Sequence, residues 1–129
     1  MSVRQWLGQR RWLYLWLPLI AWMGLIFYLS AQPDLPHPDI GWTALLFSSG
    51  AHAFVFGVLA ILWARVLAGR PRAIYAAFGL TMLYALADEI HQAFVPGRHP
   101  DLWDLICDGL GAAMGLFLWV WLQRGKTTG

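Results

Sequence analysis

Residues 12–29, WLYLWLPLIAWMGLIFYL, contain no charged side chain. A helix rises about 1.5 Å per residue, so roughly 20 mostly apolar residues cross a hydrocarbon core about 30 Å thick. Three later stretches have the same character, with carboxylates only near one end where they occur at all: residues 45–67, 73–94 and 102–122. The sequence therefore predicts four membrane-spanning helices.

The composition indicates a membrane protein and not a soluble one. Hydrophobic residues make up 59% of the 129 residues and charged residues only 12%, against about 25% charged in a typical soluble domain. Because the connections are short, we expect an all-α fold, a compact antiparallel bundle of four transmembrane helices. We divide the chain into a cytoplasmic segment 1–11, a membrane domain 12–122 and a cytoplasmic tail 123–129. Pro18 should loosen the first helix locally.

The placement of Lys and Arg predicts the orientation. Eight of the nine lie on one side of the four spans: Arg4, Arg10, Arg11, Arg65, Arg70, Arg72, Arg124 and Lys126. The positive-inside rule places this side, and both termini, in the cytoplasm of a multi-pass protein of the inner (cytoplasmic) membrane. Arg98 and the seven acidic residues then lie toward the outside: Asp34, Asp39, Asp88, Glu89, Asp101, Asp104 and Asp108.

Four smaller features of the sequence are consistent with a membrane protein of this topology. Tryptophans mark both boundaries as an aromatic belt does, with Trp42 and Trp103 outside and Trp12, Trp63 and Trp121 inside. The first apolar stretch is longer than the core of a cleaved signal peptide, about 7–15 residues, so we expect it to be retained. The net charge of +2 comes from the cytoplasmic rim, which does not suggest a nucleic-acid partner. The single cysteine lies in an apolar helix and is expected to be a packing residue.

Ionisable side chains occur at a common depth in three of the spans. Asp108 lies seven residues past Asp101, and His52 lies seven residues past the start of the second span, so each is about 10 Å below the outer surface. Asp88 lies six residues before the end of the third span, at about 9 Å. Asp101 itself is well placed to cap the fourth helix. Polar groups at such depth are costly and are usually functional.

Helical periodicity places these groups on inward faces. Asp101, Asp104, Asp108, Gly111 and Gly115 form one stripe on the fourth helix. The two glycines are a small-xxx-small pair, which marks close packing of another helix. Likewise Ser48, His52 and Phe56 share a face of the second helix, and Asp88, His91 and Gln92 are neighbours on the third.

Clustered carboxylates cannot all ionise at low dielectric without compensation, which a protonated histidine, Arg98, shared protons or a bound cation would supply. The candidate catalytic residues are therefore the polar groups of this layer: His52, Asp88, Glu89, His91, Gln92, Arg98, Asp104 and Asp108. A divalent cation is the cofactor that would suit four of them, Asp88, Glu89, Asp104 and Asp108. Two purely structural interpretations stay open, in which His52 is a neutral histidine bonded between helices and Arg98 folds back onto Asp88 or Glu89.

The same residues resemble the VanZ-like family of small bacterial membrane proteins. The resemblance rests on SAQ at residues 30–32, His52, DEIHQAFVPGR at residues 88–98, Asp101, Asp104, and DGLG at residues 108–111, and it covers residues 12–122. The family often carries Asn at the position of Asp108. Its namesake is associated with low-level tolerance to the glycopeptide teicoplanin, beside genes that remodel peptidoglycan precursors. The resemblance thus implies a bilayer protein whose partners are a lipid-linked envelope precursor or a glycopeptide.

Four classes of function fit this sequence. An enzyme would use the carboxylates and a histidine for acid–base or metal-assisted chemistry on a lipid-linked envelope substrate, with Arg98 on a phosphate. A binding module would hold a lipid or an amphiphilic antibiotic without changing it. A proton- or cation-coupled transporter would use the carboxylate–histidine set as a relay, although four spans are few unless the chain forms a homo-oligomer. An assembly role would need the layer for stability only.

Overall fold

The structure, a computed structural model, describes residues 2–33 and 41–127, with the backbone only for residues 4, 7, 41–47 and 127. Its four helices are α1 (Val3–Ser30), α2 (Gly41–Leu67), α3 (Ala73–Gln92) and α4 (Leu102–Thr127). No strand occurs in the described ranges. Each helix is long and apolar enough to cross a membrane. The predicted all-α fold with four membrane-spanning helices is confirmed.

Helix α1 begins nearer the N-terminus than the hydrophobic pattern predicts. Ser2 and Gln5 form a capping box, in which the Ser2 side chain accepts from the Gln5 backbone N–H and the Gln5 side chain accepts from the Ser2 N–H. The helix also continues through Pro18 and does not end there. The polar residues before position 12 are therefore a helical extension of the first span.

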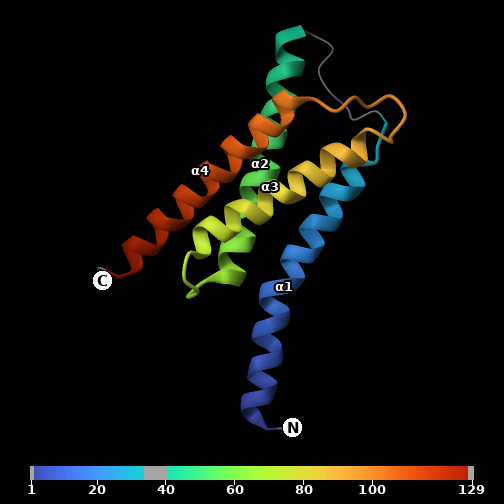
Figure 1. The fold of residues 1–129 in the computed structure, drawn as a ribbon. Coiled ribbons are helices and arrows are strands. Elements are labelled where there is room, and N and C mark those ends of the chain that lie inside the picture. The colour runs from blue at the N-terminus through green and yellow to red at the C-terminus, as the bar shows by residue number, and fades with distance from the viewer. Residues whose placement is uncertain (1, 34–40, 128–129) are drawn as a thin grey trace.

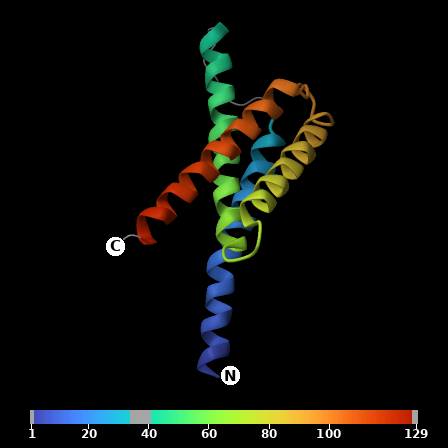
Figure 2. The same ribbon diagram turned by 60° about the vertical axis from the view of Figure 1, so that its left-hand side comes forward.

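Consecutive helices run antiparallel, so α2 and α4 run in the same direction (Figure 1). Within the described residues, α2 contacts the other three helices, whereas α1 contacts α2 and α3 but not α4. Both views show the N-terminal half of α1 projecting beyond the bundle (Figures 1 and 2). The side chains of Arg4 and Trp42 and the residues Asp34 and Asp39 lie outside the described part. The cytoplasmic position of the termini stays a prediction.

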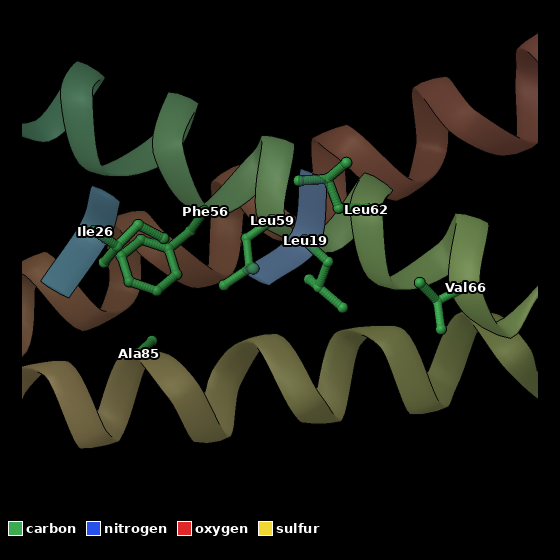
Figure 3. Packing of buried hydrophobic residues seen from close by; sticks show 7 residues of the cluster. All are labelled: Leu19, Ile26, Phe56, Leu59, Leu62, Val66 and Ala85. Carbon is green, nitrogen blue, oxygen red and sulfur yellow. The ribbon is translucent and has the colours of Figure 1, made fainter. Parts of the chain in front are cut away.

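The apolar core is centred on α2. Leu19 and Ile26 of α1 pack against Phe56 and Leu59 of α2, and Ala85 of α3 closes the cluster (Figure 3). Outside this core, large apolar side chains are exposed along every helix, and at most 33% of the most apolar window of any span is buried inside the protein. Such a surface would be unfavourable in water but suits lipid tails. The chain is therefore a multi-pass membrane protein.

Helices α2 and α4 approach each other through residues without bulky side chains. A Cβ built on Gly111 would overlap the backbone of Ala53, and one built on Gly115 would lie 2.5 Å from the Gly57 carbonyl oxygen. A Cβ on Gly57 would lie 2.9 Å from the Gly111 carbonyl oxygen. The predicted close contact at Gly111 and Gly115 is thus confirmed, and its partner is the Ala53–Gly57 face of α2. We call these four residues the glycine seam.

Among the described residues, several hydrogen bonds hold α1 against the bundle, and two of them are donated by aromatic side chains. Trp22 Nε1 donates to the Val55 carbonyl of α2 at 2.9 Å, and the Tyr84 hydroxyl of α3 donates to the Met23 carbonyl at 2.6 Å. In lipid, where apolar contact between helices has no hydrophobic driving force, such interhelical bonds help to fix the arrangement.

Candidate functional site

The glycine seam brings His52 and Asp108 together. His52 directly precedes Ala53 on α2, and Asp108 lies about one turn before Gly111 on α4. His52 Nδ1 is 2.9 Å from Asp108 Oδ1, and Asp108 is only 1% exposed. Since a carboxylate can only accept, Nδ1 carries the proton when Asp108 is ionised. The opposite ring nitrogen, Nε2, then faces Asp104 Oδ2 at 3.6 Å, beyond direct hydrogen-bond distance.

Glu89 brings the third helix into this group. Its Oε2 accepts from the backbone N–H of Asp101 at 3.0 Å, which ties the end of α3 to the start of α4. Its carboxylate lies within electrostatic range of Asp104, Asp108 and His52. Asp101 Oδ1 accepts from the Trp103 N–H at 2.9 Å, so the predicted capping role of Asp101 is confirmed. We call His52, Glu89, Asp104 and Asp108 the acidic–histidine cluster.

Two buried carboxylate oxygens in this cluster have no partner. Among the described residues, three buried side-chain atoms lack a hydrogen bond, and two of them are Glu89 Oε1 and Asp108 Oδ2. The third, Trp63 Nε1, lies toward the opposite end of α2. A buried acceptor left without a partner costs about 1–3 kcal/mol. The cluster therefore offers acceptor capacity that the described side chains do not use.

Asp88 and Gln92 extend the polar layer along α3. Gln92 Nε2 donates to Asp88 Oδ2 at 3.1 Å, and both side chains are buried. Asp88 also lies within electrostatic range of Asp108 and of Tyr84. The common depth predicted for Asp88, His52 and Asp108 thus corresponds to one connected layer.

His91 lies apart from this layer, against α1. Its ring stacks on Phe27 with centroids 4.5 Å apart, and its Nδ1 is 3.4 Å from the buried Ser30 hydroxyl. The sequence flags Ser30 only through the family pattern at residues 30–32, and it does not reveal that Ser30 would meet His91. Of the three residues predicted to be neighbours on α3, Asp88 and Gln92 contact each other in the polar layer, whereas His91 contacts α1.

Arg98 does not neutralise the carboxylates. Among the described residues it forms no ion pair with Asp88 or Glu89, so the loop clamp considered from the sequence is not formed there. Nor does the described part of the chain contain a group of three or more His, Cys, Asp or Glu residues placed to hold a metal ion. The predicted set Asp88, Glu89, Asp104 and Asp108 is thus connected electrostatically but is not arranged around one ion.

This arrangement suits proton transfer. A buried carboxylate that accepts from one imidazole nitrogen fixes the tautomer and orientation of the ring, and the other nitrogen can then take or give a proton. The side chains of His52 and Asp104 are 15% and 20% accessible, whereas Asp108 is 1% exposed, so the cluster is more open at His52 and Asp104 than at Asp108. At this rim Trp103 Nε1 donates to Ser49 Oγ at 3.1 Å, a contact between α4 and α2 that the sequence did not reveal.

Fold and site together define a four-span membrane protein with a polar acidic–histidine layer near one end of its bundle. The family model described as VanZ/LLP1 matches residues 15–123. The chain belongs to the VanZ-like family, and the resemblance seen in the sequence is confirmed. No curated protein and no solved structure matches it.

Proposed function

We propose that this protein acts from the outer leaflet on the polar head of a lipid-linked cell-envelope component. His52 would transfer the proton and Asp108 would orient its ring. The single observation that carries the proposal is the 2.9 Å contact of His52 Nδ1 with a carboxylate that is 1% exposed. The outer position comes from the arginine distribution along the sequence.

The other members of the layer have roles that follow from their positions. Asp104, at 3.6 Å from Nε2, would meet the group that exchanges a proton with His52. Glu89 would hold the start of α4, and with it Asp104, through its bond to the Asp101 N–H. Arg98, in the loop that joins α3 to α4, would bind the phosphate of the same substrate. The exposed apolar faces of the helices would accommodate its lipid tail.

The test compares cells that express the wild type, His52→Asn or His99→Asn. Asn keeps an N–H donor for Asp108 but removes Nε2, so the variant separates proton transfer from packing. His99 is an exposed histidine of the α3–α4 loop and is the matched control. Lipid-linked envelope precursors are extracted and measured by mass spectrometry, and teicoplanin tolerance is recorded in parallel.

We expect the wild type and His99→Asn to change the same precursor at similar rates. His52→Asn should slow that change by at least about a hundredfold, the lower end of the range for a general acid–base group. An unchanged activity of His52→Asn would overturn the proposal. If the wild type instead holds an unmodified lipid in stoichiometric amount, the protein binds the lipid without turnover and is not an enzyme for it.

A further inference from the structure

We infer that the group received by the acidic–histidine cluster is a primary ammonium group carried by an amphiphile. The inference deepens the proposed function by naming the class of head group, and it rests on that function only for the use of this site. It is carried by the unpartnered buried oxygens of Glu89 and Asp108 together with the charge around them.

The charge of the cluster favours a cation. Asp104, Asp108 and Glu89 interact pairwise with one another, and each also interacts with His52. One protonated histidine can balance only one of three carboxylates, and Arg98 pairs with none of them in the described part of the chain. A phosphate or carboxylate entering here would meet like charge in a region of low dielectric.

The hydrogen-bonding capacity of the cluster favours a donor. Glu89 Oε1 and Asp108 Oδ2 are buried without a partner, although Glu89 and Asp108 are only 7% and 1% exposed. The Asp104 carboxylate accepts no hydrogen bond from the described residues. Three carboxylates thus each have a free oxygen. A primary ammonium has three N–H donors and no acceptor, which matches this set in number and in charge.

The spacing favours a polyatomic cation over a bare metal ion. Metal ligands must converge to about 2.0–2.6 Å from one point, and no such group exists among the described residues. An ammonium nitrogen bonds to carboxylate oxygens at about 2.7–2.9 Å, so its acceptors can lie farther apart. The 3.6 Å gap between His52 Nε2 and Asp104 Oδ2 marks the partly exposed edge where this group would enter.

The experiment uses purified wild-type protein in nanodiscs that contain equal fractions of phosphatidylethanolamine, phosphatidylcholine and phosphatidylglycerol. Ethanolamine and choline head groups share charge and phosphate, but only ethanolamine has N–H donors. Glycerol has hydroxyl donors without the positive charge. Native mass spectrometry after release from the nanodisc counts the lipids that stay bound.

We expect phosphatidylethanolamine to be retained about tenfold over phosphatidylcholine, the effect of one charge-assisted hydrogen bond, and also over phosphatidylglycerol. Equal retention of the three lipids, or a preference for phosphatidylglycerol, would overturn the inference. Free ethanolamine distinguishes the source of the amine. If millimolar ethanolamine leaves the bound lipid in place, the amphiphile is required; if it displaces the lipid, the ammonium chemistry stands and a soluble amine is the ligand.

Two variants locate the effect. Glu89→Gln keeps the size of the side chain and removes its charge, so it should abolish the preference for ethanolamine over choline. Asp101→Asn removes a charge from the same end of α4 and retains a good helix cap, so it should keep the preference. If both variants keep the preference for ethanolamine over choline, or if both lose it, the ammonium group is not bound by the acidic–histidine cluster. The wild type could show no lipid preference and still change the precursor in a way that depends on His52. That result would overturn this inference and leave the proposed function standing.

Discussion

Gly111→Ala tests whether the glycine seam sets the distance between α2 and α4. The added Cβ would overlap the Ala53 carbonyl oxygen and lie 2.5 Å from the Ala53 Cα and carbonyl carbon. Carbon atoms in contact are about 3.5–4.0 Å apart, so the two backbones must separate by roughly 1 Å. The obstructing atoms are backbone atoms, and no side-chain rotation can relieve the overlap.

The expected loss of stability follows from two opposing terms. Overpacking costs typically about 1–3 kcal/mol, and the better helix propensity of alanine returns up to about 1 kcal/mol. Gly111→Ala should therefore lower the free energy of unfolding by about 1–2 kcal/mol. Because Asp108 lies about one turn away on the same helix, the same movement should also lengthen the 2.9 Å contact with His52 and reduce activity.

The assay is unfolding in mixed micelles with increasing dodecyl sulfate, followed by far-ultraviolet circular dichroism. Gly109→Ala is the matched control, because its Cβ would meet only the flexible end of Met82 at 3.5 Å. A Cβ added at Gly115 or at Gly57 would lie 2.5 or 2.9 Å from a backbone oxygen. Gly115→Ala and Gly57→Ala should therefore lose less stability than Gly111→Ala and more than Gly109→Ala, with the larger loss at Gly115. If Gly111→Ala is as stable as Gly109→Ala, or if the order of the four variants is reversed, the glycine seam does not set the distance between α2 and α4.

Three further predictions concern polar contacts, each measured as the free energy of unfolding in the same micelles. Tyr84→Phe loses the 2.6 Å bond to α1 and should cost about 1 kcal/mol, whereas Tyr75→Phe, at a residue 79% exposed, should change little. Asp101→Ala should cost about 1 kcal/mol through loss of the α4 cap, and Asp101→Asn should be near neutral; equal losses would argue against capping. His52→Leu leaves Asp108 buried without its partner and should cost about 3–5 kcal/mol, most of which Asp108→Leu in the same chain should restore. A double variant less stable than His52→Leu alone would show that the pair is not the cause.

The sequence predicted the helices because the requirement behind them is local. A span must be long and apolar, and residues 12–29 satisfy this without reference to the rest of the chain. The inward face of α4 could be predicted for the same reason, since Gly111 and Gly115 are about one turn apart on one helix. The start of α1 could not, because polar residues before position 12 carry no hydrophobic signal, and the capping box of Ser2 and Gln5 governs that end.

The site was predicted in its composition but not in its contacts. Depth along each helix placed His52, Asp88 and Asp108 in one layer, since rise per residue needs only a common reference surface. Which side chains meet depends on the rotation of one helix against another, which single-helix periodicity does not contain. His91 shows the difference: it is one turn from Asp88 in sequence terms, yet it packs on Phe27 of α1.

The acidic–histidine cluster is difficult to explain as a device for stability. Its two unpartnered oxygens together cost about 2–6 kcal/mol, a large part of the roughly 5–15 kcal/mol that stabilises a typical folded domain. An apolar pair at His52 and Asp108 would fill similar space without that cost. The glycine seam, which brings the two helices close enough for His52 to reach Asp108, also leaves little room for larger side chains beside them. A bundle selected for stability alone would not need both features, whereas a site that receives a charged donor needs the close approach and the free acceptors at the same level.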